Sequence, residues 1–317
     1  MNKIKGWLSQ TEYKNHTMEV ASADASFRKY YRLKNGGDSV LLMDSSLEKN
    51  SLKPFLDITT RLLNANINAP KILLENQDDG FLIIEDFGNI HYLNLLNQSN
   101  YKTLYSDATS SILAMQNADT KGLPLYDEKF LHIEMDLMRE WYLEKLLGVK
   151  LTVSQAELIT TTLKAISKVV LEQPQGVFVH RDFHSRNIML YDEREIGVID
   201  YQDAMNGAIT YDLVSLLKDC YISFDENEIR KLALEFRDKK GLSIDDDTFI
   251  KWFDFMGLQR HIKVLGVFSR LSIRDSKDGY LKDIPLTLKY VLDTANKYSE
   301  TKEFALLLEK LAKNGAV

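Results

Sequence analysis

The stretch VFVHRDFHSRNIML, residues 177–190, decides the fold because charged side chains follow an apolar run directly. The apolar residues predict a strand, and the polar segment after them predicts a loop. Within this segment Asp182 precedes Asn187 by five positions, so one loop carries a carboxylate near its start and an amide at its end. Phosphoryl transfer needs a carboxylate to accept a proton and oxygen ligands for Mg²⁺. The alternative is an ordinary solvated turn between two strands.

A second carboxylate follows at the end of the next apolar run. The segments NIMLY (187–191) and EIGVIDY (195–201) flank a charged turn and predict a β-hairpin. Asp200 comes thirteen residues after Asn187, where the end of a strand would deliver a carboxylate into a cleft. The order of strand, Asp182, Asn187, hairpin and Asp200 therefore favours phosphoryl-transfer chemistry over a solvated turn.

Upstream, the first 90 or so residues predict a small sheet that carries one helix. Phe55, Ile58, Leu62 and Leu63 recur at helical spacing before Pro70. Short apolar, aromatic or β-branched runs, several of them separated by turn residues, predict the strands of an antiparallel meander: TMEVAS (17–22), FRKYYRL (27–33), SVLLMD (39–44), PKILLE (70–75) and FLIIED (81–86).

Downstream, long amphipathic segments predict a mainly helical region interrupted by the hairpin. Apolar residues recur at three- and four-residue intervals in segments 101–116, 128–148 and 153–173. The order of elements predicts an α+β fold with two lobes and a cleft between them. We place the N-lobe at residues 1–88 and the C-lobe, with the catalytic loop, at 89–317.

Composition narrows the class of protein further. The 317 residues are 44% apolar, and 46 acidic against 40 basic residues give a net charge of −6, which opposes nucleic-acid binding. No signal peptide or membrane span is apparent, and the single Cys220 rules out a disulfide framework, so we expect a cytoplasmic protein. His180 and His184 have zinc-ligand spacing, but a loop without a third ligand disfavours zinc.

The motifs resemble a known superfamily. FVHRDFHSRNIML and GVIDYQDAMNGAITYDLVSLLKD resemble the aminoglycoside phosphotransferases and choline kinases, which share the protein-kinase-like two-lobed fold. SADASFRKYYRL, VLLMD, PFLDI and MGLQRHIKVLGVFSRL resemble more closely the bacterial anomeric kinases of N-acetylmuramate and N-acetylglucosamine. The similarity runs over nearly the whole chain, and it implies ATP, Mg²⁺ and a small-molecule sugar substrate.

The resemblance also implies roles for individual residues. Asp182 would be the catalytic base, with Asn187 and Asp200 as Mg²⁺ ligands. Asp212, in AITYDLVSL, would order the catalytic loop through hydrogen bonds, with His180 as a second structural support. A helix N-cap is the plainer interpretation of Asp212, and it is compatible with that role.

The segment FLIIEDFG falls where the inter-lobe hinge belongs in this fold. Backbone groups near Glu85, Asp86 and Phe87 are therefore expected to meet the adenine. A strand-end turn without a ligand is the alternative.

The phosphate-binding elements depart from the usual kinase pattern. Met43 stands where a strand lysine is expected, and the first loop, SADASF, lacks glycine, although Ser26 and its small neighbours still let backbone N–H groups approach a phosphate. Strand alternation puts Arg28 and Arg32 on one face, so we expect Arg28 to replace the lysine. The alternative is an exposed basic strand face.

Acceptor residues are expected on a later helix and beyond the metal ligand. In FMGLQRHIKVLGVFSRLSIRD, four cations lie in one narrow sector: Arg260, Lys263, Arg270 and Arg274. A solvated face is one interpretation. The other is that Arg260 and Arg270 bind an anionic group such as the lactyl carboxylate of muramate, while Asp203 bonds sugar hydroxyls or is merely exposed.

The sequence thus predicts an ATP- and Mg²⁺-dependent kinase that phosphorylates the anomeric hydroxyl of an amino sugar. We expect a monomer that binds neither nucleic acid nor membrane. Two alternatives stay open. An aminoglycoside or another small alcohol is a possible acceptor, and Met43 with the glycine-poor loop is compatible with a catalytically silent nucleotide-binding or scaffold protein.

Overall fold

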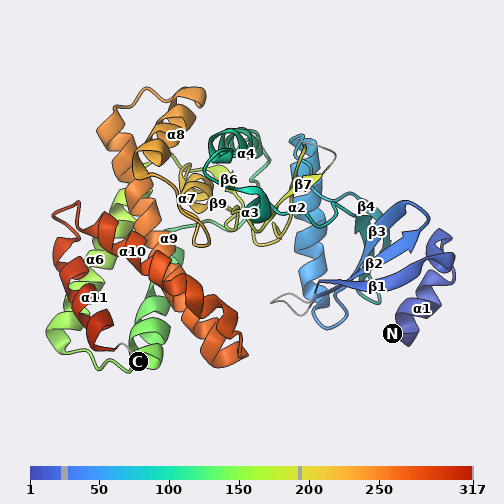
Figure 1. Ribbon diagram of the computed structural model, residues 1–317, viewed down its shortest axis with the longest axis horizontal. Helices are drawn as coiled ribbons and strands as arrows, with labels where there is room; N and C mark the ends of the chain where they lie inside the picture. The colour runs from blue at the N-terminus through green and yellow to red at the C-terminus, as the bar shows by residue number, and fades with distance from the viewer. Residues whose placement is uncertain (23–27, 192–194, 316–317) are drawn as a thin grey trace. The chain divides into compact units, whose positions relative to one another are not determined.

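The computed structural model describes residues 1–22, 28–191 and 195–315 of the protein, which form two compact units (Figure 1). Unit 1 comprises Met1–Leu95 and Arg186–Ala204, and unit 2 comprises Leu96–Ser185 and Met205–Val317. The hairpin segment groups with unit 1 because Val198 N–H donates to the Asn68 carbonyl and Leu190 N–H to the Ile90 carbonyl, both at 2.8 Å. The sequence-based lobe boundary at residue 88 stays a prediction.

Unit 1 contains a five-stranded antiparallel sheet in the order β1-β2-β3-β5-β4. Its strands are β1 Thr17–Ser22, β2 Lys29–Asn35, β3 Asp38–Asp44, β4 Ile72–Asn76 and β5 Phe81–Glu85. The predicted meander is therefore correct for β1 to β3 and wrong for β4, since β5 pairs with β3. Four of the five β5 residues are buried, which suits an inner strand, whereas β4 alternates between partly buried and exposed residues at the edge.

Helices flank this sheet, and the hairpin belongs to the same unit. The α-helices of unit 1 are α1 Asn2–Leu8, α2 Leu52–Asn64 and α3 Tyr92–Leu95. The hairpin strands are β7 Ile188–Tyr191 and β8 Glu195–Val198. The expectation of a single helix is wrong. The seven-residue α1 inserts Ile4 and Leu8 into a core cluster with Leu33 and Leu42, a contact too distant in sequence for local periodicity to predict.

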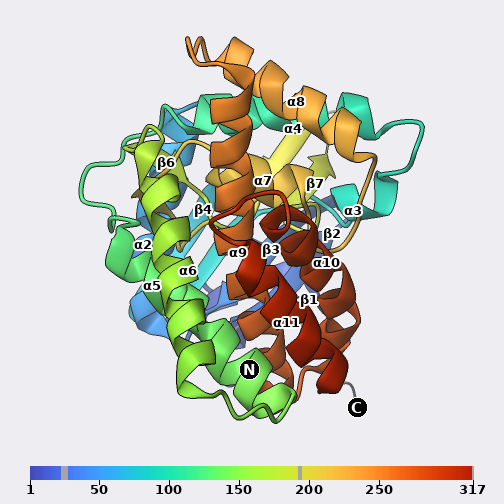
Figure 2. The same ribbon diagram turned by 90° about the vertical axis from the view of Figure 1, so that its left-hand side faces the viewer.

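Unit 2 is mainly helical, and α9 packs against α5, α6 and α10, while α11 packs against α10 and α6 (Figure 2). No described helix is long and apolar enough to cross a membrane. The elements are α4 Tyr101–Met115, α5 Glu128–Leu137, a π-helix Met138–Leu146, α6 Val153–Glu172, α7 Tyr211–Leu217, α8 Glu226–Lys239, α9 Asp246–Asp275, α10 Ile284–Ala295, α11 Lys302–Asn314 and the short strands β6 Val177–Val179 and β9 Met205–Gly207.

The packing of α9 depends on one glycine. A Cβ atom at Gly266 would lie 2.3 Å from the backbone carbon of Leu137, at the junction of α5 and the π-helix. No side chain can move aside to relieve this contact, because the atoms it meets belong to the backbone. Gly266 therefore lets the central helix approach its neighbour closely enough to form the core of unit 2.

We expect Gly266→Ala to lower the free energy of unfolding by about 3 kcal/mol, because the helices must separate to admit the methyl group. Gly257→Ala on the same helix is the matched control, since its new Cβ would find its nearest atom, Val214 Cγ1, at an ordinary 3.7 Å. That control should be neutral or up to about 1 kcal/mol more stable. Chemical denaturation compares the two variants, and equal stability would contradict the packing argument.

Candidate active site

A buried carboxylate on α7 fixes the start of the loop that carries Asp182. Asp212, 1% exposed, accepts the N–H of His180 at 2.8 Å and the N–H of Arg181 at 3.0 Å. These are the hydrogen bonds that the family resemblance implies for Asp212. Asp212 lies in the first turn of α7 after the N-cap residue Thr210, so the N-cap interpretation is wrong.

The loop backbone at this point adopts an uncommon conformation. Arg181 has a φ of 78°, in the left-handed region that L-residues seldom adopt. The N–H of Asp182 donates to His180 Nδ1 at 3.2 Å, so the imidazole carries its proton on Nε2. Burial raises the pKa of Asp212 to about 6, although His180 and the two backbone N–H groups act to lower it.

The surroundings of Asp182 are cationic. Burial alone would raise the pKa of this carboxyl, but Lys263, His184, Arg181 and Arg260 together lower it to about 2. Lys263 and Arg260 come from α9, and both are mostly buried. Asp182 is therefore ionised at neutral pH inside a shell of positive charge contributed by unit 2.

Glu134 on α5 pairs with two of these cations and was missed by sequence reasoning. It accepts from Arg181 Nη2 at 2.5 Å, from Lys263 Nζ at 3.1 Å and from Gln259 Nε2 at 3.2 Å, and it also binds the Tyr126 hydroxyl. Burial raises the pKa of Glu134, and Lys263 and Arg181 more than offset this effect. The signal that could have identified Glu134 is its position on the buried face of α5, one residue before Met135.

The hairpin brings Asn187 and Asp200 together within unit 1. Ile188 pairs with Val198, and Ile199 N–H donates to the Asn187 carbonyl at 3.1 Å. As a result Asn187 Nδ2 lies 3.3 Å from Asp200 Oδ2. The other carboxylate oxygen of Asp200 accepts Gln202 Nε2 at 3.0 Å, and Asp200 itself has a φ of 65°. A positive φ is uncommon at a non-glycine residue.

The donor set of this pair suits a hard divalent cation. Carboxylate and amide oxygens are the ligands Mg²⁺ prefers, and Mg²⁺ sites in phosphotransferases often use only one or two protein ligands beside phosphate and water. Across the described ranges no cluster of three His, Cys, Asp or Glu side chains is arranged for a metal. Asn187 and Asp200 therefore fit a Mg²⁺ site completed by a ligand's oxygens.

The side chains of the predicted hinge residues contact other residues of unit 1. The Phe87 ring stacks on Tyr191 with centroids 4.4 Å apart, and a Cβ at Gly197 would lie 2.4 Å from that ring. The Glu85 carboxylate lies 3.6 Å from Lys71 Nζ. Among the described residues, the backbone N–H and carbonyl of Phe87 have no hydrogen bond. These backbone groups can therefore accept and donate hydrogen bonds to a ligand, and the contact with adenine stays a prediction.

Arg28, which directly precedes β2, and Arg32 in β2 are both buried, so the alternative of an exposed basic face is wrong for them. Arg32 is committed to Asp86, which it binds through Nε at 2.5 Å and Nη2 at 2.9 Å. Arg28 packs over the Phe55 ring at 5.6 Å, and its bonds to Ser51 are long, at 3.3 Å. The register puts Arg32 on the sheet face of the fully buried Met43. Ser26, the predicted phosphate-loop residue, lies outside the described residues.

The cationic stripe on α9 runs from the core to the surface. Arg260 is 4% exposed, and its one hydrogen bond among the described residues is to Cys220 Sγ, a weak acceptor, at 3.4 Å. Arg270 is partly buried and its Nε has no partner in the described part of the chain. Arg274 is exposed and pairs with Asp275. The solvated-face interpretation is therefore correct only for Arg274 and wrong for Arg260.

Asp203, the other predicted acceptor residue, is exposed and accepts Gln202 Nε2 at 3.4 Å. Unit 2 thus brings Asp182, Arg260 and Lys263 together, whereas Asp203 belongs to unit 1.

Solved structures with the same architecture identify the fold class. A choline/ethanolamine kinase family protein from Mesorhizobium loti has a TM-score of 0.67 and 11% identity, covering 98% of this chain and 99% of that one. An aminoglycoside phosphotransferase in complex with gentamicin has a TM-score of 0.65 and 16% identity, covering 91% of this chain and 96% of that one. The predicted α+β, protein-kinase-like fold is confirmed.

Sequence comparisons place the chain in a family. The model of the phosphotransferase enzyme family matches residues 17–241. An N-acetylmuramate/N-acetylglucosamine kinase from Neisseria meningitidis serogroup B is 39% identical, covering 97% of this chain and 95% of that one. A kinase of the same name from Pseudomonas aeruginosa is 36% identical, covering 92% and 87%. The chain belongs to the phosphotransferase enzyme family, so the predicted enzyme class is confirmed.

Replacing Asp182 by Asn should lower the free energy of unfolding at pH 7 by about 2 kcal/mol, because a folded-state pKa of about 2, against 3.8, means that the ionised form is stabilised. This contribution is present above about pH 4 and is lost as the pH falls toward about 2. Chemical denaturation measured at several pH values from 7 to 3 should show that the variant and the wild type differ less in free energy of unfolding as the pH falls. A variant as stable as the wild type at pH 7 would contradict the cationic-shell account.

Proposed function

We propose that the protein is an ATP- and Mg²⁺-dependent kinase that phosphorylates the anomeric hydroxyl of N-acetylmuramate or N-acetylglucosamine. The curated relatives carry this substrate pair in their names and match nearly the full chain at up to 39% identity. We further propose that it works in the cytoplasm as a monomer on a free small-molecule sugar. Division of the chain into lobes near residue 88 is part of the same proposal.

The cationic shell around Asp182 is the observation that carries the choice of acceptor. Lys263, Arg181 and Arg260 all lie close enough to lower the pKa of its carboxyl. These cations would repel a polycationic aminoglycoside that approached Asp182, whereas they would not repel a neutral or anionic sugar. The shell therefore supports an amino sugar over an aminoglycoside as the acceptor.

The low pKa of Asp182 also bears on which hydroxyl reacts. A carboxylate with a pKa of about 2 is a weak base, so it contributes mainly by orienting the acceptor and by accepting the proton late in the transfer. A hemiacetal hydroxyl loses its proton more readily than an ordinary alcohol. An anomeric hydroxyl hydrogen-bonded to Asp182 is thus well suited to this site.

Residues of unit 1 supply the nucleotide end of the reaction in this proposal. The backbone of Glu85 and Phe87 meets the adenine, while Ser26 and Arg28 approach the phosphates in place of the absent lysine at Met43. Asn187 and Asp200 would hold Mg²⁺, which neutralises negative charge on the transferring phosphoryl group. Binding of a phosphate group by Arg28 is compatible with its long hydrogen bonds to Ser51.

Arg260 is the residue best placed to hold an acceptor carboxylate. Its buried guanidinium acts to lower the pKa of Asp182. Among the described residues, its one hydrogen bond is to the Cys220 thiol. Arg270 lies ten residues further along α9, about 15 Å away along the axis, so one carboxylate cannot meet both. Arg260 is therefore the carboxylate ligand in this proposal, while Arg270 contacts another part of the acceptor.

Asp182→Asn should reduce kcat by about 10²- to 10⁴-fold and leave the KM for ATP within about twofold, because the amide cannot accept the hydroxyl proton. A coupled ADP-release assay with N-acetylmuramate measures both constants. Asp293→Asn, which removes an exposed carboxylate paired with Lys289, is the control and should match the wild type. Near-normal turnover of the Asp182 variant would exclude it as the base.

Arg260→Gln should raise the KM for N-acetylmuramate by about 10- to 100-fold, because a charge-assisted hydrogen bond to its carboxylate is lost. N-acetylglucosamine lacks that carboxylate, so its KM should change by less than about threefold. The ratio of the two kcat/KM values is decisive, since any effect transmitted through Asp182 is common to both sugars.

Arg274→Gln is the matched control on the same helix, because Arg274 is exposed and pairs with Asp275. It should leave both sugars unaffected. If Arg260→Gln weakened both sugars equally, the assignment of Arg260 to the lactyl carboxylate would be wrong.

A further inference from the structure

The far end of the catalytic loop is held by a second buried carboxylate, Asp219. It is fully buried, and its Oδ2 accepts both the N–H of Ser185, at 2.9 Å, and the Ser185 hydroxyl, at 2.5 Å. Its Oδ1 accepts the N–H of Tyr221 at 3.0 Å. Asp219 follows Asp212 by seven residues, so one short segment of unit 2 supplies a carboxylate to each end of the loop 180–185.

These bonds connect to Asp182 through the loop backbone. His184 N–H donates to the Asp182 carbonyl at 3.1 Å, and Ser185 is the next residue. Asp212 holds the N–H groups of the two residues before Asp182. Asp182 therefore lies between two anchored points, and its backbone position depends on both of them.

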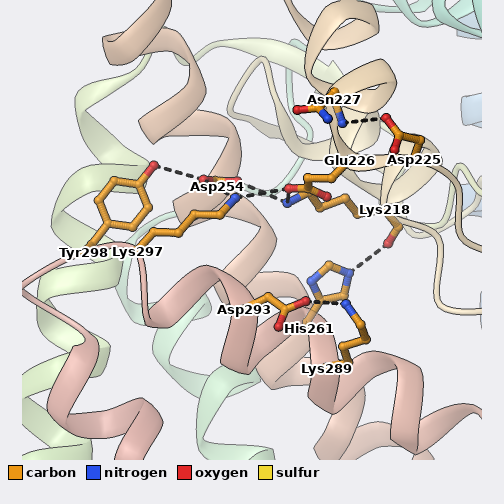
Figure 3. Close-up of polar contacts among 10 residues, drawn as sticks. All are labelled: Lys218, Asp225, Glu226, Asn227, Asp254, His261, Lys289, Asp293, Lys297 and Tyr298. Carbon is orange, nitrogen blue, oxygen red and sulfur yellow. Dashed lines mark hydrogen bonds and ion pairs between the residues drawn. The ribbon is translucent and has the colours of Figure 1, made fainter.

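Asp219 is itself held by the residue before it, Lys218, whose side chain is 4% exposed. Figure 3 shows Lys218 pointing toward Asp254 and Glu226, and its Nζ lies 3.1 Å from a carboxylate oxygen of each. The Lys218 carbonyl lies 2.8 Å from His261 Nε2, which must donate because a carbonyl only accepts.

The network around Lys218 is balanced in charge. Lys297 Nζ binds the same two carboxylates, Glu226 at 3.1 Å and Asp254 at 3.3 Å, and the Tyr298 hydroxyl donates to Asp254 at 3.0 Å (Figure 3). Two cations thus meet two anions. Lys218 and Asp254 are buried, whereas Glu226 and Lys297 are partly exposed. A movement that separated Lys218 from Asp254 would leave a buried charge without its partner, so this pair resists displacement.

We propose that Asp219 is a positioning residue for phosphoryl transfer: it holds Ser185, and through it the segment that carries Asp182, while the Lys218 network holds Asp219. Asp219 acts through the loop backbone and does not contact the reacting atoms. The proposal deepens the proposed function, on which its kinetic readout rests.

The kinetic test compares Asp219→Asn, Ser185→Ala and the double variant with Asp293→Asn as the matched control. Asp219→Asn should lower kcat by up to about 10²-fold with the KM for ATP nearly unchanged, because a displaced Asp182 orients the acceptor poorly. Ser185→Ala should act in the same direction. The double variant should be no slower than Asp219→Asn alone, since both changes remove one interaction. Asp293→Asn should match the wild type.

Hydrogen exchange by mass spectrometry supplies the readout that needs no substrate. In Asp219→Asn, amides of residues 183–187 should exchange about tenfold or more faster, while peptides of α9 and α10 stay protected. Ser185→Thr keeps the hydroxyl and should restore the slow exchange that Ser185→Ala loses. Faster exchange throughout unit 2 would mean that Asp219 only supports folding, and that would overturn the proposal.

The two hypotheses fail in different ways. Wild-type protein that transfers phosphate to neither sugar would refute the proposed function, and the exchange measurement would still decide the role of Asp219. If the wild type is active and Asp219→Asn has a normal kcat, only the positioning role is refuted. The same holds if the effects of Asp219→Asn and Ser185→Ala on kcat multiply in the double variant.

Discussion

The structure of this site depends on a buried carboxylate that binds two successive backbone amides. Asp212 accepts the N–H groups of His180 and Arg181 and so stabilises a left-handed residue that would otherwise be unfavourable. The chain turns at Arg181, and Asp182 follows immediately. Because Asp212 is buried, water does not compete for these bonds, and the loop keeps one conformation next to Asp182, the base in the proposed function.

Charge balance around this loop explains how a carboxylate can be mostly buried and still ionised. Glu134 neutralises part of the charge of Arg181 and Lys263, and the remaining positive charge lowers the pKa of Asp182. The same cations make this part of unit 2 unfavourable for a polycationic acceptor. One arrangement of charges thus keeps Asp182 ionised and also supports the acceptor that we propose.

Local sequence patterns predicted the structural elements whose formation depends on residues close together in the chain. The hairpin at residues 187–201 and the loop before it follow from short apolar runs, and the spacing of Asp182 and Asn187 predicted phosphoryl-transfer chemistry. Contacts between distant segments were not predictable in this way. The pairing of β3 with β5, the docking of α1 by Ile4 and Leu8, and the commitment of Arg32 to Asp86 all depend on tertiary structure. Asp219 follows Asp212 by seven residues, just after the end of α7, and its bonds to Ser185 were likewise not predicted.

The most direct test of the account is ³¹P NMR of the protein with Mg·ATP and, separately, N-acetylmuramate, N-acetylglucosamine, kanamycin and choline. We predict a new resonance with either amino sugar, with the phosphorus coupled to the anomeric proton, and no ester with kanamycin or choline. Phosphate on kanamycin, on choline or on another sugar hydroxyl would contradict the proposed acceptor. ATP binding without transfer to any acceptor would instead indicate a catalytically silent nucleotide-binding protein.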